Sequence, residues 1–203
     1  MVRLTVGCRL IFHMRMFYAF AVPGLWLAWC IYWWVTGRNV KPTTRRESLG
    51  SRAAHIVPLV IAVLLLALPK LPFGFLSERM LPATRLVFFV GLALVLAGLL
   101  FTVWARVFLG RNWSGIVTLK QDHELVRGGP YRWVRHPIYS GLLLAFAGSA
   151  VVRGEWRGLL ALVIAIAALW RKLRLEERWL GEAFGDQYAK YRAEVAALIP
   201  FVL

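Results

Sequence analysis

The chain has 203 residues, of which 60% are hydrophobic, and its formal net charge at pH 7 is +15. A mean hydropathy of +0.62 is too high for an ordinary soluble domain. The arginines and lysines cluster in the gaps between apolar runs, which is typical of membrane proteins and argues against a nucleic-acid-binding face. The composition predicts an integral membrane protein whose basic loops meet anionic lipid headgroups.

The first half of the chain contains three apolar runs that approach or reach the length of about 20 residues needed to cross a bilayer. The first predicted span is 16–35, with a kink expected at Pro23-Gly24 and a belt of tryptophans towards its end. Because the run is long and has no small-x-small cleavage site, we interpret it as a retained helix and not a signal peptide. The second and third spans are 53–68 and 86–109. The third carries small residues suited to close helix contact, namely Gly91, Ala93, Ala97 and Gly98.

The second half of the chain predicts a helical hairpin. A fourth span over 137–152 and a fifth over 159–170 are both short for full spans, and the fifth is expected to continue through 171–184. A final polar helix is expected over 186–197. The predicted fold class is therefore all-α, a polytopic integral membrane helical bundle with about five transmembrane helices.

Charge counting gives an orientation for five spans. One side of the membrane would receive the 36–52 loop, the 106–135 segment and the C-terminal tail, which hold most of the lysines and arginines. The positive-inside rule predicts that this side is cytoplasmic, although the N-terminal arginines argue the other way. With no internal repeat or low-complexity linker, residues 1–203 are expected to form a single membrane domain, in which 1–109 supply the first three helices and 110–203 the functional portion.

A polar stretch lies at the expected start of the fourth span. Proline fits the first turn of a helix, so the helix should begin at Pro137 with His136 near its N-cap. A helix N-terminus together with the donor fork of Arg135 suits an anion such as a carboxylate. Tyr131 and Tyr139 add aromatic faces with hydroxyl tips. A simple anchor among lipid headgroups is an equally open alternative.

A second polar stretch, Glu176-Glu177, closes the fifth apolar run after Arg171, Lys172 and Arg174. Lys172 and Arg174 lie at helical spacing from the two carboxylates, so internal ion pairing is one interpretation. The other interpretation is that the pair lies at the mouth of the hairpin, facing the first stretch. A carboxylate there could accept ribose hydroxyls or hold an ammonium or sulfonium group, with a charge-pair energy on the order of 4 kcal/mol before desolvation.

Other cofactor and metal patterns are missing from the sequence. It has no G-x-G-x-x-G within a βαβ unit, no Ser-His-Asp order and no P-loop, so a Rossmann-type site is not expected. His13 and His55 have no partner at metal-ligand spacing, and Cys8 and Cys30 are isolated, so neither a metal site nor a disulfide framework is predicted. His123, in a loop, would ordinarily be solvated.

These two stretches resemble the isoprenylcysteine carboxyl methyltransferase family and the related phospholipid N-methyltransferases. The resemblance covers about the last 80 residues. In the first block the matching residues are His123, Leu125, Val126, Gly128, Gly129, Pro130, Tyr131, Arg135, His136, Pro137, Tyr139 and Gly141. In the second block they are Glu176, Glu177, Leu180, Phe184, Gly185, Tyr188 and Tyr191, closing at Pro200.

The resemblance implies a membrane methyltransferase that uses S-adenosylmethionine, bound in a pocket partly enclosed by C-terminal helices, and yields S-adenosylhomocysteine. It implies catalytic roles for Arg135, His136 and Glu177. By position, the cofactor-binding residues would be His123, Leu125, Val126, Tyr131, Arg135, His136, Pro137, Ile138, Tyr139, Glu176 and Glu177.

The acceptor side of the site departs from the family pattern. A substrate-side arginine lies four residues before the cofactor glutamate in the family, and this position holds Lys172 here, so Arg171, Lys172 and Arg174 are all candidates. A carboxylate acceptor is already deprotonated, so methyl transfer would rest on alignment and exclusion of water. An amine or thiol acceptor would need a base such as His136 or a glutamate.

The leading hypothesis is methylation of the C-terminal carboxylate of a prenylated cysteine, or of a similar lipophilic acceptor entering from the bilayer. Methylation of a phospholipid amine or a small thiol is the close alternative. An NADPH-dependent sterol-type reductase and a non-enzymatic membrane scaffold are the remaining hypotheses. The expected location is a bacterial inner membrane, with the cofactor site on the cytoplasmic side.

Overall fold

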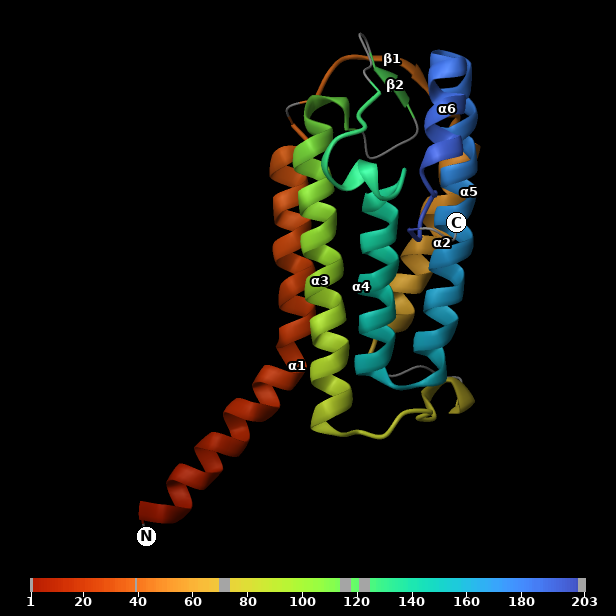
Figure 1. The fold of residues 1–203 in the computed structure, drawn as a ribbon. Coiled ribbons are helices and arrows are strands. Elements are labelled where there is room, and N and C mark those ends of the chain that lie inside the picture. Colours follow the sequence, from red (N-terminus) through yellow and green to blue (C-terminus); the bar gives the residue numbers. More distant parts are fainter. Residues whose placement is uncertain (1, 39, 70–73, 114–117, 121–124, 201–203) are drawn as a thin grey trace.

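The computed structural model of the protein describes residues 2–38, 40–69, 74–113, 118–120 and 125–200. Long helices run side by side as a bundle, with short elements at its two ends (Figure 1). The helices and strands are α1 (Val2–Thr36), β1 (Thr43–Arg46), α2 (Leu49–Ala67), η1 (Gly74–Ser77), α3 (Arg85–Leu109), η2 (Gly110–Asn112), β2 (Thr118–Lys120), η3 (Gly129–Arg132), α4 (Pro137–Arg153), α5 (Trp156–Phe184) and α6 (Asp186–Glu194).

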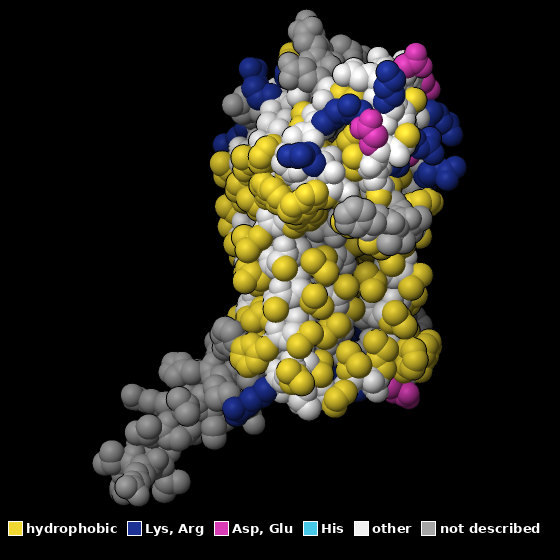
Figure 2. Space-filling view, viewed as in Figure 1, with side chains coloured by type: hydrophobic (Ala, Val, Ile, Leu, Met, Phe, Trp, Pro, Cys, Tyr) yellow, Lys and Arg dark blue, Asp and Glu magenta, His cyan; other side chains and the backbone are white. Residues whose placement is uncertain are grey.

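The predicted helical membrane bundle is confirmed. Among the described residues, three helical stretches are long and apolar enough to cross a membrane: Ala19–Thr36, Leu49–Ala67 and Arg85–Asn112. The shorter apolar helix α4 and the apolar first half of α5 form the expected hairpin, joined at Gly154-Glu155. Figure 2 shows hydrophobic side chains over the middle of one face and basic side chains gathered at the end that carries α6 and the strands.

Several details differ from the predictions, and the first helix begins at Val2 and not at Met16. The second helix begins earlier, at Leu49, because the Ser48 side chain accepts a hydrogen bond from the Ser51 N–H and caps it. The last helix ends at Glu194 and not at Ala197, because the following segment is extended and pairs with the chain before α4. The antiparallel pairing of β1 with β2, which ties the two basic loops together, was not predicted.

Tryptophans of α1 attach that helix to the bundle. The indole N–H of Trp26 donates to Ser149 Oγ on α4 at 3.0 Å, and that of Trp29 donates to Thr102 Oγ1 on α3 at 2.6 Å. Polar contacts of this kind hold helices together where lipid offers no hydrophobic driving force. These two tryptophans therefore serve packing, whereas Trp34 is exposed as a membrane-interface residue would be. α1 also contains Pro23 and bends away from the bundle in its N-terminal part (Figure 1).

Close contact between α3 and α4 depends on glycines. A methyl group on Gly98 would lie 2.5 Å from the Gly141 carbonyl oxygen, and one on Gly91 would lie 2.7 Å from the Gly148 carbonyl oxygen. Gly91 and Gly98, two of the four small residues predicted for helix contact, are therefore at the interface, about two helical turns apart. This packing places the N-terminus of α4 firmly against α3.

At the opposite end of the bundle a buried arginine closes the hairpin. Arg157, only 1% exposed, donates to Glu155 Oε2 at 2.6 Å and to the Leu68 carbonyl at 2.7 Å. It thereby satisfies a carbonyl at the end of α2 that has no partner within the helix. The hairpin and α2 are fixed to each other at this end.

We expect Gly98→Ala to lower the melting temperature of the detergent-purified protein. The added methyl group would force α3 and α4 apart, at a cost of about 1–3 kcal/mol. Gly24→Ala is the matched control, since a methyl group there meets nothing within 4 Å and alanine favours a helix. Equal melting temperatures for the two variants would contradict the close-packing interpretation.

Candidate functional site

The first polar stretch and the C-terminal tail are joined through their backbones. The N–H of Arg135 donates to the Ala196 carbonyl at 2.8 Å, and that of His136 donates to the Ala197 carbonyl at 3.0 Å. The Ser140 hydroxyl donates to the Leu198 carbonyl at 2.6 Å. The extended tail therefore lies along the start of α4, where it covers the side chains described next.

Arg135 and Glu177 form a buried ion pair between the start of α4 and α5. The Nε and Nη2 atoms of Arg135 both donate to Glu177 Oε1, at 2.8 and 2.6 Å, and both side chains are only 8% exposed. Nη1 donates to the backbone carbonyls of Arg192 and Val195. Every nitrogen of this guanidinium is thus engaged by α5, α6 or the tail.

His136 extends the same cluster. Its Nε2 lies 3.3 Å from Glu177 Oε1. Burial by itself would raise the pKa of Glu177, but hydrogen bonds from His136 and Arg135, and the charges of these two groups, outweigh burial and lower the pKa to about 2. Glu177 is therefore ionised across the physiological pH range.

Glu176 is the more accessible of the two carboxylates. The Tyr139 hydroxyl donates to Glu176 Oε1 at 2.6 Å, and Glu176 Oε2 lies 3.7 Å from His136 Nδ1. The rings of His136 and Tyr139 stack with centroids 5.4 Å apart. With 23% of its side chain exposed, compared with 8% for Glu177, Glu176 is partly open to a ligand.

The three basic candidates before the glutamates point in different directions. Lys172 is buried, and its Nζ lies 5.4 Å from the centroid of the Tyr139 ring, so it belongs to the cluster. Arg171 is exposed and donates to the Ser51 carbonyl of α2 at 3.0 Å. Arg174 is also exposed. The position that departs from the family pattern is the one that faces Tyr139.

The remaining predicted cofactor residues surround this cluster to different degrees. Tyr131 is buried, and burial, followed by the charge of Glu176, raises the pKa of its hydroxyl. Pro137 is the first residue of α4 with His136 as its N-cap, as predicted. Ile138, Leu125 and Val126 are half-buried. His123 lies outside the described residues.

The sequence resemblance implied that C-terminal helices enclose part of the pocket, but it gave no individual residue of α6 or the tail a role. Tyr191 donates its hydroxyl to the Tyr131 carbonyl at 2.6 Å, and Arg192 lies 3.8 Å from Glu177 Oε2 through its Nε. The signal for Tyr191 was present in the matching block of residues, where it was noted without a role. The tail carbonyls carry no such signal, because a backbone carbonyl is the same at every position. Arg192 was not among the matching residues.

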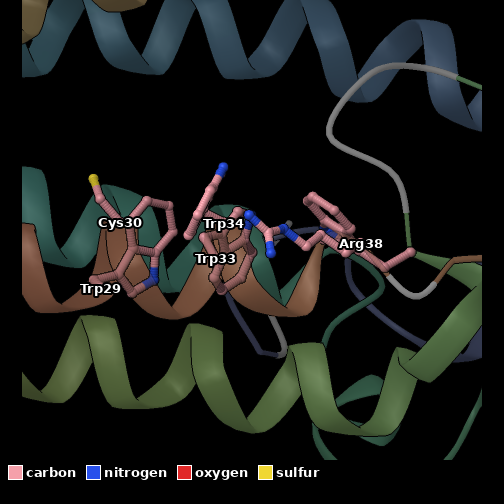
Figure 3. Close-up of a pocket in the computed structure, with 7 residues that line it drawn as sticks. Trp29, Cys30, Trp33, Trp34 and Arg38 are labelled. Carbon is pink, nitrogen blue, oxygen red and sulfur yellow. The ribbon is translucent and has the colours of Figure 1, made fainter.

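A separate open groove of about 500 Å³ runs along α1. Figure 3 shows its labelled residues along that helix, and none of its lining residues belongs to the polar cluster. The lining suits an apolar chain better than a charged cofactor. It consists of Trp29, Cys30, Trp33, Trp34, Gly37, Arg38 and Trp113.

The comparisons with known proteins match the region that holds the cluster. A family model described as phospholipid methyltransferase matches residues 86–187, which is half of the chain. The chain belongs to the phospholipid methyltransferase family. The match includes the start of α4 and both glutamates but not α2 or the tail.

Named relatives of this family member are methyltransferases. It is 36% identical over 126 residues to protein-S-isoprenylcysteine O-methyltransferase of Saccharomyces cerevisiae, covering 59% of this chain and 52% of the relative. It is 30% identical over 118 residues to protein-S-isoprenylcysteine O-methyltransferase B of Arabidopsis thaliana, covering 55% and 58%. It is 34% identical over 122 residues to methanethiol S-methyltransferase of Mycobacterium tuberculosis, covering 49% and 48%. The matches thus span about half the length of these relatives.

The fold is shared with a solved structure of the eukaryotic intramembrane Ras methyltransferase ICMT (isoprenylcysteine carboxyl methyltransferase). The TM-score is 0.56 with 23% sequence identity, over 78% of this chain and 55% of that one. At this identity the likeness concerns the fold. It supports the helical membrane bundle predicted from the sequence.

Loss of the Glu177 charge should lower the stability of the folded protein and should reduce the amount of stability that is lost in acid. A carboxyl whose folded pKa is lowered stabilises the folded state above its ordinary pKa of 4.5, and this contribution is lost as pH falls towards 2. The shift corresponds to on the order of 3 kcal/mol. We expect Glu177→Gln to have a lower melting temperature than the wild type at pH 7. The difference in melting temperature between the two proteins should become smaller as pH falls from 4.5 to 3.

The control for this experiment is Glu182→Gln, which removes an exposed carboxylate from the same helix. Its melting temperature should stay close to that of the wild type at both pH values. A difference between Glu177→Gln and the wild type that does not change with pH would contradict the lowered pKa.

Proposed function

We propose that the protein is an integral membrane methyltransferase that uses S-adenosylmethionine and acts on a lipophilic acceptor from the bilayer. The first candidate for the acceptor group is the C-terminal carboxylate of a prenylated cysteine. One observation carries this proposal. The family-matched segment folds so that the start of α4, Tyr139 and Glu176 form one polar cluster at the end of an otherwise apolar bundle.

The chemistry of these donors fits the cofactor. The N-terminus of α4 carries a partial positive charge suited to a carboxylate, and Glu176 offers a partly exposed carboxylate suited to a cation or to hydroxyl groups. When bound, S-adenosylmethionine supplies a methyl group activated by its sulfonium charge. Tyr139 orients Glu176 by its hydrogen bond, and the predicted contacts from His123, Leu125, Val126, Tyr131, Pro137 and Ile138 would complete the pocket.

Arg135 and Glu177 are better suited to holding the pocket together than to contacting the cofactor. Sequence reasoning gave the Arg135 fork to an anion, but in the structure its nitrogens point to Glu177 and to the tail. The partial positive charge of the α4 N-terminus remains for the anion, while the N–H groups of His136, Tyr139 and Ser140 already have carbonyl partners. His136 lies between the two glutamates and would fix both carboxylates at once.

Lys172 is the basic residue that we assign to the acceptor. It shares a helix face with Glu176, four residues later, and lies against the Tyr139 ring. A buried ammonium group beside the cofactor site would attract and align an anionic acceptor while α5 and the tail exclude water. With a carboxylate acceptor, no proton has to be removed before methyl transfer.

The start of α4 lies towards the end of the bundle that carries α6 and the strands (Figure 1), and basic side chains gather at that end (Figure 2). This arrangement supports a cytoplasmic site in contact with anionic headgroups, and we propose a bacterial inner membrane as its location. A small thiol is the second candidate acceptor, because one relative is named methanethiol S-methyltransferase. Glu176, whose carboxylate is partly exposed, is the group placed to take the thiol proton in that case, because both ring nitrogens of His136 face carboxylates.

Titration of the detergent-purified wild type with S-adenosylhomocysteine should show saturable binding. Glu176→Gln and His136→Ala should weaken it at least tenfold, or about 1.4 kcal/mol, because each removes a group that faces the proposed pocket. Glu182→Gln, on the same helix but outside the cluster, should bind as the wild type does. Lack of binding by the wild type, or unchanged binding in both cluster variants, would overturn the proposal.

The acceptor is tested with cofactor carrying a labelled methyl group. We expect label on an S-farnesylated cysteine in a base-labile form, since an ester is hydrolysed by base and a thioether or amine is not. Lys172→Met should lower kcat/KM for this acceptor at least tenfold through the loss of the cation. Base-stable label on a thiol or on phosphatidylethanolamine would instead assign the alternative acceptors.

A further inference from the structure

Glu47 and His55 form a buried pair outside the segment that the family model matches. Glu47 lies between β1 and α2, and His55 lies on α2. His55 Nε2 is 3.4 Å from Glu47 Oε1, and both side chains are 1% exposed. A carboxylate next to an imidazole suggests a general base, so the hydrogen bonds of the ring decide what the pair can do.

The second ring nitrogen of His55 faces α5. Arg171 Nη1 lies 3.5 Å from His55 Nδ1 and also donates to the Ser51 carbonyl at 3.0 Å. A guanidinium only donates, so Nδ1 accepts and the ring proton is on Nε2, pointing to Glu47. Nε2 lies 3.4 Å from the Glu47 carboxylate without forming a hydrogen bond to it, so the attraction between these two groups is electrostatic. The imidazole therefore has no lone pair left for a substrate, which excludes a general base in this arrangement.

The pair is connected to the acceptor side of the proposed site through Arg171, which contacts His55 Nδ1 at 3.5 Å and immediately precedes Lys172 on α5. The charged groups that act on His55 are Glu47 from its own side and Arg171, Lys172 and Glu176 from α5. The pair is thus linked to the basic residues before Glu176.

Packing alone gives little reason for such a pair. Burying a carboxylate is costly, and a buried ion pair contributes little net stability compared with apolar residues of the same size. The Glu47 carboxylate fixes the His55 ring, however, and the ring nitrogen that accepts from Arg171 fixes the position of that cation. Arg171 is held by its contacts with α2, and Lys172 follows it on the same helix.

We propose that Glu47 and His55 are positioning residues of the acceptor site, which fix Arg171 against α2 and thereby set the face of α5 from which Lys172 meets the anionic group of the acceptor. This inference rests on the proposed function and deepens it. It adds α2 and the segment before it to a site otherwise built from α4, α5 and the tail, and it makes recognition of a negative charge the property that they control.

The test uses Glu47→Gln and His55→Gln in the detergent-purified protein. The readouts are KM and kcat for an S-farnesylated cysteine, inhibition by its uncharged carboxamide analogue, and the Kd of S-adenosylhomocysteine. We expect KM for the carboxylate to rise about tenfold, with kcat, carboxamide inhibition and cofactor Kd each within about twofold of the wild type. Glu78→Gln, at an exposed position near η1, should change none of these.

A second variant distinguishes the proposed effect from a loss of folding. Glu47→Asp keeps the charge but shortens its reach, so we expect a smaller rise in KM, about threefold, with the melting temperature preserved. Unchanged KM in the folded variants would overturn the inference. So would a parallel loss of carboxylate, carboxamide and cofactor binding, which is the signature of a structural role. If the wild type binds no S-adenosylhomocysteine and methylates no acceptor, the proposed function itself fails, and this inference fails with it.

Discussion

A buried guanidinium and a buried carboxylate, Arg135 and Glu177, hold together the three parts of the chain that make the site. Arg135 precedes α4, Glu177 lies on α5, and the tail carbonyls accept from the same guanidinium. Removal of either partner would leave a charge buried without compensation, at a cost of about 3–5 kcal/mol. Glu177 is paired with Arg135, whereas its neighbour Glu176 is partly exposed. The two adjacent glutamates can therefore serve different purposes.

The rest of the bundle keeps that contact in place. Gly98 and its facing glycine bring α3 within backbone contact of α4, while Arg157 closes the hairpin at the far end. Both ends of α4 are therefore fixed before any ligand binds. A site whose walls are fixed in advance loses less conformational entropy on binding and aligns its ligands more closely.

Sequence patterns predicted the helices well and the site in part. Apolar runs, Pro137 at a helix start and the Glu176-Glu177 pair each give a local signal, and the structure unites the last two through Tyr139 and His136. Contacts that depend on backbone atoms, or on side chains far apart in the chain, give no such signal. Glu47 and His55 are separated from α5 by over a hundred residues, so only the packing of α2 on α5 reveals them.

The central claim is that the cluster around Glu176 binds S-adenosylmethionine. A high-resolution experimental structure of the protein with S-adenosylhomocysteine tests it most directly. The account predicts the ligand carboxylate at the N-terminus of α4 and its other polar groups against Glu176 and Tyr139, with Arg135 still paired to Glu177. Ligand density elsewhere, for example in the aromatic groove along α1, or an Arg135 that leaves Glu177 to bind the ligand, would contradict it.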